Sequence, residues 1–307
     1  MDALKGECSI AGIFAMNVKK WLKNNTSSLV GKTVAVTGTT GGLGNELCRY
    51  LAELGASLIL LDRNYTRSSE FRDELVAEYG VKVECITVDL EDMESVICLT
   101  QELAAMPIDI FIHNAGAYSI PRKICSTGYD NVFQINFVSP YYIIRTLLPV
   151  LRARGGRAVA VGSIAHDYSK ADEDDVDFST RDRASRVYGN AKRYLMYALW
   201  ELFKDESSAS LAIVHPGISF TNITAHYPKL IFAVIKHPMK VIFMKPKKAC
   251  LSILKGCFEP TGYCRWIGPW MFDVWGRPAV KKVTTADENE RSFISQRAEE
   301  IFHRVSP

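Results

Sequence analysis

Two stretches of the chain hold residue types that could carry out chemistry together. Tyr188 and Lys192 lie four positions apart in Ala184–Phe203, a segment whose apolar pattern predicts a helix. Residues i and i+4 share one face of a helix, so these two side chains should lie on the same side. Far upstream, Gly31–Gly44 reads GKTVAVTGTTGGLG, a short apolar strand that breaks at glycines before a helix begins. The second stretch indicates where a dinucleotide would bind, and the first indicates chemistry beside it.

The glycine turn has the features of a phosphate-binding loop. Thr33–Val36 is β-branched and apolar, as in a buried parallel strand, and a helical pattern starts at Leu43. Missing side chains let backbone N–H groups approach a pyrophosphate at the positive end of the helix dipole. A strand–turn–helix that uses glycine only for its turn geometry is the alternative. The residues expected to contact the cofactor here are Gly38, Thr40, Gly42, Leu43 and Gly44.

Composition bounds the class of protein. The 307 residues are 48% hydrophobic and 23% charged, which fits one globular α/β domain with a large core. A net charge of +3 is too small to imply nucleic-acid binding. Eight cysteines lack metal-ligand spacing, so we expect buried free thiols and no metal site. No run is apolar enough to span a membrane and no secretory signal is evident, so we expect a cytoplasmic protein.

Strand and helix patterns alternate along the chain. Strands are predicted at 33–36, 57–61, 82–88, 108–112, 157–161 and 210–214. Helices are predicted at 68–79, 93–103, 128–154, 184–203 and 287–305. Repeated β–α–β units imply an α/β fold with a doubly wound parallel sheet and helices on both faces. We expect residues 1–30 to be an N-terminal extension and residues 31–307 to form a single domain.

Polar or small residues follow the predicted strands, at the edge of the sheet where ligands bind in such folds. Asp62 ends the second strand, where a carboxylate can bind an adenosine ribose and repel a 2′-phosphate, which favours NAD over NADP. Arg63 follows and could instead pair with a 2′-phosphate. Asp89 is placed to meet the adenine, or else caps the next helix. The other cofactor candidates at strand ends are Leu90, Asn114, Ala115, Gly116, Pro216, Gly217, Ser219 and Thr221.

Three further segments bear on the site. Asn136 lies within the predicted helix 128–154, and local sequence alone predicts that it faces solvent. Residues 171–183 form an acidic insert, most simply a solvated loop, because it lacks the pattern of a calcium loop. Residues 226–255 carry lysines and many apolar side chains but no acid. We interpret them as part of an apolar substrate lid, about residues 218–260, with an anionic membrane surface as an alternative or additional contact.

The order and spacing of these motifs resemble the short-chain dehydrogenase/reductase superfamily over about residues 30–270. The resemblance implies a Rossmann fold, a nicotinamide cofactor and a tyrosine-centred hydride-transfer site. The glycine pattern fits both the short form and the extended form of sugar-nucleotide epimerases, and the long Ser163–Tyr188 spacing is explained by the acidic insert. The extension, the insert and the lid are similar to the retinol- and steroid-dehydrogenase-like branch. The matching residues are Thr37-Gly38 with Gly42 and Gly44, Asn114-Ala115-Gly116, Asn136, Ser163, Tyr188 with Lys192, and Pro216-Gly217.

The resemblance also implies a role for each catalytic candidate. Tyr188 would be the general acid/base, with its phenolate favoured by the Lys192 ammonium and by the charge of the nicotinamide. Lys192 would also bind the nicotinamide ribose. Ser163 would hold the substrate oxygen, and Asn136 would anchor a water chain that relays the proton through Lys192.

These roles predict an NAD(P)-dependent oxidoreductase that acts on a small-molecule secondary alcohol or ketone, and the lid favours a lipophilic one. One alternative is a sugar-nucleotide epimerase or dehydratase with tightly held NAD and no net cofactor turnover. Another is a non-catalytic dinucleotide sensor, which would bind the cofactor without activity. A homo-oligomer is expected by analogy with the family only.

Overall fold

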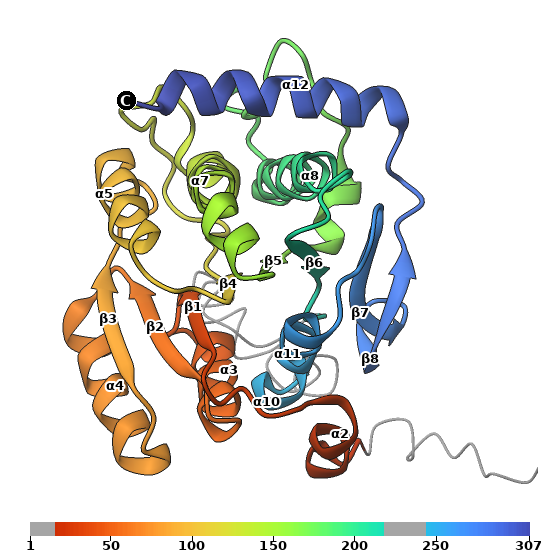
Figure 1. Ribbon diagram of the computed structural model, residues 1–307. Coiled ribbons are helices and arrows are strands. Elements are labelled where there is room, and N and C mark those ends of the chain that lie inside the picture. Colours follow the sequence, from red (N-terminus) through yellow and green to blue (C-terminus); the bar gives the residue numbers. More distant parts are fainter. Residues whose placement is uncertain (1–15, 218–243) are drawn as a thin grey trace, which may run out of the picture.

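The computed structural model describes residues 16–217 and 244–307, and an eight-stranded sheet lies at its centre (Figure 1). The strand order is β3-β2-β1-β4-β5-β6-β7-β8, and β8 is antiparallel to β7. The doubly wound parallel sheet expected from the sequence is confirmed, with an antiparallel strand added at one edge. The strands are β1 (Thr33–Thr37), β2 (Ser57–Asp62), β3 (Val83–Thr87), β4 (Ile110–His113), β5 (Arg157–Val161), β6 (Ser210–Val214), β7 (Arg265–Met271) and β8 (Trp275–Lys282).

Helices cover both faces of the sheet (Figure 1). One layer holds α5 (Met93–Ala104), α7 (Ser139–Ala153) and α8 (Ala184–Leu202). The other holds α3 (Gly42–Glu53), α4 (Tyr65–Tyr79) and α11 (Leu251–Phe258). Successive side chains of a strand point to opposite faces, so both layers receive apolar residues from every central strand. In β5, for example, Ala158 and Ala160 pack into the first layer and Val159 into the second.

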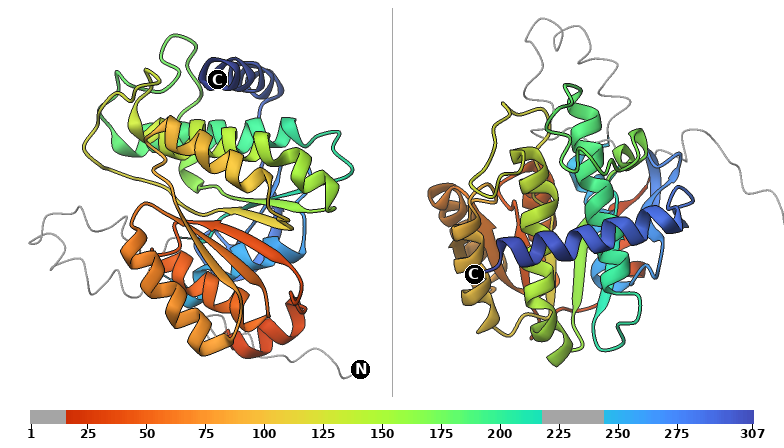
Figure 2. Two further views of the ribbon diagram at one scale, coloured as in Figure 1. Left: turned by 60° about the vertical axis from the view of Figure 1, so that its left-hand side comes forward. Right: turned by 90° about the horizontal axis from the view of Figure 1, so that it is seen from above.

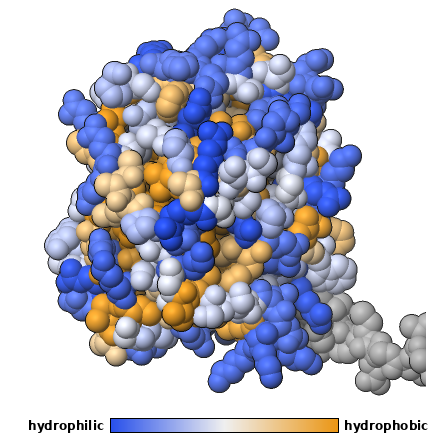
Figure 3. All heavy atoms as spheres, viewed as in Figure 1, coloured by the Kyte–Doolittle hydropathy of each residue, from blue (hydrophilic) through white to orange (hydrophobic). Residues whose placement is uncertain are grey.

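The last helix forms an outer layer of its own. Helix α12 (Glu288–Val305) runs across the outer side of α7 and α8 (Figure 2). Its Ile294, Ala298 and Ile301 are buried there, and the Phe302 ring packs against Tyr142 with centroids 5.3 Å apart. Hydrophilic residues cover the top of the molecule in Figure 3, where α12 turns its other side to solvent. The predicted helix at 287–305 is therefore confirmed, and its apolar stripe faces the helices beneath it.

Several predicted segments differ from the structure. The helix expected at 128–154 is instead α6 (Asn131–Phe133), a π-helical turn η1 (Gln134–Val138) and α7. At the start of the chain, α2 (Val18–Asn25) buries Trp21 in the second layer. Residues 218–243, which hold Ser219, Thr221 and most of the predicted lid, lie outside the described residues. The end of that lid segment forms α10 (Pro246–Ala249) and α11, whose apolar side chains pack beneath the sheet.

Two classes of feature are missing from the described part of the chain. No helix in residues 16–217 or 244–307 is long and apolar enough to cross a bilayer. Within the same ranges, no group of three or more His, Cys, Asp or Glu side chains is arranged to hold a metal ion.

Candidate active site

The glycine turn lies at the point where the strand order reverses, between β1 and β4. Gly38 has a φ of +72°, which favours glycine, and a Cβ there would approach Ala115 Cα to 3.0 Å. Gly44 packs so closely on the turn that a Cβ would collide with the Gly38 carbonyl oxygen. No described side chain caps α3, which begins after Gly41. The first N–H groups of α3 and the positive end of its dipole therefore suit a pyrophosphate, as a dinucleotide-binding site requires.

A pair of polar side chains joins the glycine turn to the end of β4. Asn114 Nδ2 donates hydrogen bonds to the carbonyl oxygens of Thr37 at 3.0 Å and Gly38 at 3.1 Å. The Thr37 hydroxyl accepts from the backbone N–H groups of Asn114 and Ala115, both at 3.0 Å. The structure thus brings the predicted segment 114–116 against the turn. The role of Thr37 as this partner could not be predicted, because nothing in the local pattern indicates which side chain faces β4.

Asp62 ends β2 beside the same turn. Its carboxylate accepts from the Thr40 N–H at 3.0 Å and the Thr40 hydroxyl at 3.1 Å, and it also accepts from the Thr39 hydroxyl. Arg63 follows with an exposed side chain. The carboxylate thus holds the turn in shape from the position where a ribose would be bound.

The residues after β3 make a turn of their own. Asp89 accepts from the Glu91 N–H at 3.0 Å, while Asp92 caps α5 by accepting from the Glu94 N–H. The alternative reading of Asp89 as the cap of this helix is therefore wrong. Leu90 is buried, and its carbonyl oxygen accepts from Ser139 Oγ at 2.7 Å, which fixes the loop to the start of α7.

Ser163, Tyr188 and Lys192 meet above the carboxyl end of β5. The Ser163 hydroxyl accepts a hydrogen bond from the Ala165 N–H at 3.2 Å and lies near the phenol of Tyr188 on α8. Lys192 is buried on the same helix, with Nζ 5.8 Å from the centroid of the Tyr188 ring and 2.9 Å from the Val161 carbonyl oxygen that accepts its hydrogen bond. The Tyr118 ring packs edge-on against Tyr188 with centroids 5.4 Å apart. The i, i+4 spacing does place Tyr188 and Lys192 together, and the turn after β5 supplies the serine.

Burial changes the acidity of both groups. It raises the pKa of Tyr188 to about 12, against the opposing effect of the nearby Ser163 hydroxyl. It lowers the pKa of Lys192 to about 7. In the protein alone the phenol is therefore protonated at neutral pH and can donate a proton. Burial works here against the depressed phenol pKa that the family resemblance implies.

Asn136 lies in the π-helical turn η1 and is fully buried, so the expectation that it faces solvent is wrong. Its Nδ2 donates to the carbonyl oxygens of Ala117 and Val132, both at 2.8 Å, and its Oδ1 accepts from the Ala117 N–H at 3.3 Å. A Cβ on Gly116 would lie 2.8 Å from Asn136 Oδ1 and 3.6 Å from Lys192 Nζ. Glycine at position 116 therefore lets the Asn136 amide and the Lys192 ammonium group lie close together, because it places no side chain between them.

The turn after β6 packs on the β7–β8 hairpin. Gly217 has a φ of +79°, and a Cβ there would lie 2.9 Å from the Val274 carbonyl oxygen. His215, just before Pro216, donates from Nε2 to the Asp273 carbonyl oxygen at 3.1 Å, and its ring stacks on Trp266. Pro216 and Gly217 thus lie where the carboxyl ends of β6 and β7 meet.

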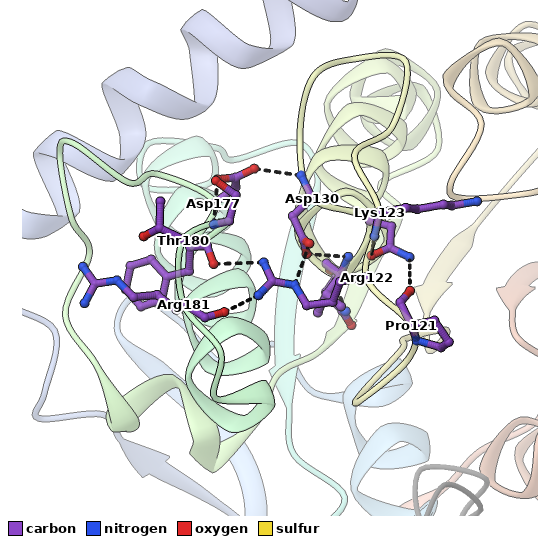
Figure 4. A network of polar contacts seen from close by, with 12 residues as sticks. Pro121, Arg122, Lys123, Asp130, Asp177, Thr180 and Arg181 are labelled. Carbon is purple, nitrogen blue, oxygen red and sulfur yellow. Dashed lines mark hydrogen bonds and ion pairs between the residues drawn. The ribbon is translucent and has the colours of Figure 1, made fainter.

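The acidic insert is anchored at Asp175 and Asp177, which are buried, while Glu173, Asp174 and Asp182 are exposed, so the predicted solvated loop is only partly correct. Figure 4 shows Arg122 between Asp130 and the insert: its Nε donates to Asp130 Oδ2 at 2.8 Å and its Nη2 to the Phe178 carbonyl oxygen at 2.9 Å. Asp177 is buried and accepts from the Asp130 N–H at 2.7 Å. These carboxylates accept hydrogen bonds from backbone and arginine donors, because the loop before α6 packs directly on the insert.

The sheet, the uncapped glycine turn and the serine, tyrosine and lysine beside it are the features that a dinucleotide-binding oxidoreductase requires. Residues 32–172 match the model of the short chain dehydrogenase family. The chain is 28% identical over 280 residues to dehydrogenase/reductase SDR family member FEY of Arabidopsis thaliana, covering 85% of this chain and 74% of that relative.

Solved structures share the fold. A protein from Mycobacterium paratuberculosis of uncharacterized function matches with a TM-score of 0.72 and 22% identity, over 91% of this chain and 96% of that one. An alcohol dehydrogenase from Thermococcus sibiricus, complexed with 5-hydroxy-NADP, matches with a TM-score of 0.57 and 21% identity, over 72% of this chain and 88% of that one. The chain thus resembles short-chain dehydrogenases/reductases, over residues 32–172 by the family model and over 280 residues by the Arabidopsis relative.

Proposed function

We propose that this protein transfers a hydride between a nicotinamide cofactor and a secondary alcohol or ketone, with Tyr188 as the general acid/base. The observation that carries the proposal is the meeting of three groups in one place: the Tyr188 phenol, the Ser163 hydroxyl near it and the buried Lys192 ammonium group. Each of these residue types is ordinary alone. Together, beside a turn suited to a pyrophosphate, they form a proton-transfer site next to a redox cofactor.

Each side chain then has a distinct task. The cofactor, when bound, supplies the hydride acceptor or donor. Tyr188 gives its proton to the substrate oxygen during reduction and takes it back during oxidation. Ser163 holds that oxygen in line with the phenol, which contributes orientation. Lys192 carries a positive charge below its pKa of about 7 and, when charged, stabilises a phenolate beside it. Asn136 holds the Ala117 backbone beside Lys192.

NAD is the preferred cofactor in this proposal. Asp62 places a carboxylate where the adenosine ribose would lie, and Thr39–Gly41 supplies no basic side chain for a 2′-phosphate. Arg63 favours NADP instead, because its exposed side chain could pair with a 2′-phosphate. Titration of the purified protein with NADH and with NADPH, followed by nicotinamide fluorescence, tests the point. Tighter binding of NADH is expected, and tighter binding of NADPH would give the specificity role to Arg63.

The proposal extends to substrate class, membrane contact and assembly. A lipophilic substrate and a membrane contact both rest on the apolar-basic composition of residues 226–255, most of which lie outside the described residues. A homo-oligomer rests on analogy alone. A screen of ketones of increasing chain length, with NADH as reductant, tests the first of these.

Tyr188→Phe tests the mechanism directly. It removes only the phenol oxygen, so turnover should fall at least about 100-fold, the contribution of a general acid, while NADH affinity stays within twofold. Tyr194→Phe is the matched control, because Tyr194 is buried on the same helix and its hydroxyl has no hydrogen-bond partner among the described residues. Turnover near the wild-type rate in Tyr188→Phe would refute the assignment.

The same purified protein also distinguishes the dehydrogenase from the two alternatives, an epimerase and a dinucleotide sensor. An epimerase would copurify with tightly held NAD and consume no added cofactor. A sensor would bind NADH in the titration and show no turnover with any ketone or alcohol. Either result in the wild-type protein would replace the dehydrogenase proposal.

A further inference from the structure

The segment that carries Ser163 is held from outside by the C-terminal part of the chain. Residues 163–171, which we call the serine turn, begin at Ser163 and continue through the short 3₁₀ helix η2 (Ile164–Tyr168). The Ser163 carbonyl oxygen accepts from His166 Nδ1 at 2.7 Å. On the other side of the ring, His166 Nε2 lies 3.0 Å from the hydroxyl oxygen of Thr285, just before α12. One imidazole therefore connects the backbone of Ser163 to the segment that leads into α12.

The partners of this imidazole determine its tautomer. A carbonyl oxygen only accepts, so Nδ1 must carry the proton that is donated to Ser163. Burial lowers the pKa of His166, whose side chain is enclosed by the Tyr197 and Trp266 rings, so the ring is neutral at pH 7. In a neutral ring Nε2 is then an acceptor, and the Thr285 hydroxyl donates to it. Serine at position 285 could make this bond, and valine, of nearly the same shape as threonine, could not.

A buried ion pair holds the rest of the serine turn. Arg193 lies on α8 with its side chain only 3% exposed, and it binds the carboxylate of Glu290 in the first turn of α12 with two nitrogens, the Nε–Oε1 distance being 2.6 Å. Its Nη1 donates to the His166 carbonyl oxygen at 2.8 Å, and its Nη2 to the Thr285 carbonyl oxygen at 3.2 Å. Glu290 also accepts from the Ala171 N–H at 2.7 Å. The start of α12 thus ties down both ends of the serine turn.

A displacement of this turn would reach the reacting groups. The Ser163 hydroxyl lies near the Tyr188 phenol, and Gly189 packs so closely on the turn that a Cβ there would collide with the Ala165 carbonyl oxygen. Close-packed interiors transmit such shifts instead of absorbing them. An error of about 1 Å at a reacting group can cost on the order of 100-fold in rate.

We propose that His166, Arg193, Thr285 and Glu290 are positioning residues for Ser163, so that the beginning of α12 helps to set the catalytic rate. None of the four touches the Tyr188 phenol in the structure; they act by fixing the backbone and direction of the serine turn. The inference rests on the proposed function, because it requires Ser163 to hold the substrate oxygen.

The test compares Thr285→Val with Thr285→Ser in the full-length protein. Three quantities are measured: NADH affinity by fluorescence, kcat and KM on the fastest ketone of a panel, and hydrogen–deuterium exchange of the serine turn. Thr285→Val should lower kcat about 5- to 10-fold, the effect of one lost hydrogen bond on the orientation of Ser163, and should speed exchange in the turn. NADH affinity and KM should stay within twofold. Thr285→Ser should restore both kcat and exchange.

Glu300→Gln is the matched control, because Glu300 pairs with Arg297 on the exposed side of the same helix, away from the serine turn. It should leave all three quantities unchanged. Wild-type kcat and exchange in Thr285→Val would overturn the proposal, and so would an equal loss in Thr285→Ser. If the wild-type protein binds no NADH, the proposed function fails on its own. Exchange then still decides the positioning claim, which is supported by a rise in Thr285→Val alone and overturned by no rise.

Discussion

At the scale of single residues, the site consists of polar groups that are buried away from solvent. Burial moves the pKa of Lys192 down to about 7 and that of Tyr188 up to about 12, so both groups are pushed toward their neutral forms. Such displaced pKa values are typical of functional sites, where a group must give up or take a proton near neutral pH. They also make stability depend on pH, because the unfolded chain has no such burial.

His215 gives the clearest prediction of this kind. Burial lowers its pKa to about 3, whereas an unfolded histidine has a pKa of about 6.5. Between these values the unfolded chain binds a proton that the folded protein does not, so stability falls as pH falls from 6.5 toward 3. His215→Phe keeps a ring against Trp266 and removes the titration. From pH 7 to 4.5, denaturant unfolding should show that the wild type loses about 2–3 kcal/mol more than this variant. Equal losses of unfolding free energy in the two proteins would contradict this prediction. The control is His303→Gln, at an exposed position, which should lose as much stability as the wild type.

Part of the site could be predicted from the sequence at this scale. The spacing of Tyr188 and Lys192 carries geometric information, because a helix repeats every 3.6 residues. The sequence around Asn136 gives no such geometric information, because the burial of Asn136 depends on the loop at Ala117 that folds over it. The same holds for His166, whose partner Thr285 is remote in sequence.

At the scale of elements, the junction of β1 and α3 depends on close backbone packing. Gly44→Ala would place a Cβ against the Gly38 carbonyl oxygen, so the helix or the turn must shift. We expect a loss of about 1–3 kcal/mol in unfolding free energy and at least tenfold weaker NADH binding. Gly41→Ala is the control, because its Cβ would lie 3.5 Å from the same oxygen with a φ of −80°. It should cost less than about 1 kcal/mol. Similar NADH affinity in Gly44→Ala and the wild type would show that the helix start can move without consequence.

The elements that could not be predicted share a physical cause. Strands β7 and β8 carry prolines, glycines and charges, and their pairing is visible only once β6 lies beside β7. The π-helical turn η1 inserts extra backbone into what reads as one continuous helical pattern, and it directs Asn136 inward. The central strands β1, β2, β4, β5 and β6 could be predicted, because burial on both faces makes each a short apolar run.

At the scale of the whole molecule, α12 closes the structure from outside. Its buried Ile294, Ala298 and Ile301 cover α7 and α8, and Glu299 accepts a hydrogen bond from the Tyr141 hydroxyl at 2.6 Å. The sequence predicts this helix but not its position, because an amphipathic stripe does not specify which partner it meets. Another copy of the chain can use the outer face of α7 and α8 only by displacing α12 (Figure 2).

The final prediction follows from that cover. Ile294→Asp would bury an unpaired carboxylate beneath α12 and should loosen the helix, because an isolated charge is strongly disfavoured in an apolar site. The α7–α8 face would then open, so we expect increased binding of a hydrophobic dye and self-association in sedimentation velocity. Ser292→Asp, on the exposed side two residues earlier, should change neither. A monodisperse Ile294→Asp protein with unchanged dye binding would show that α12 is not needed to cover this face, and that the apolar stripe contributes little beyond the Arg193–Glu290 ion pair.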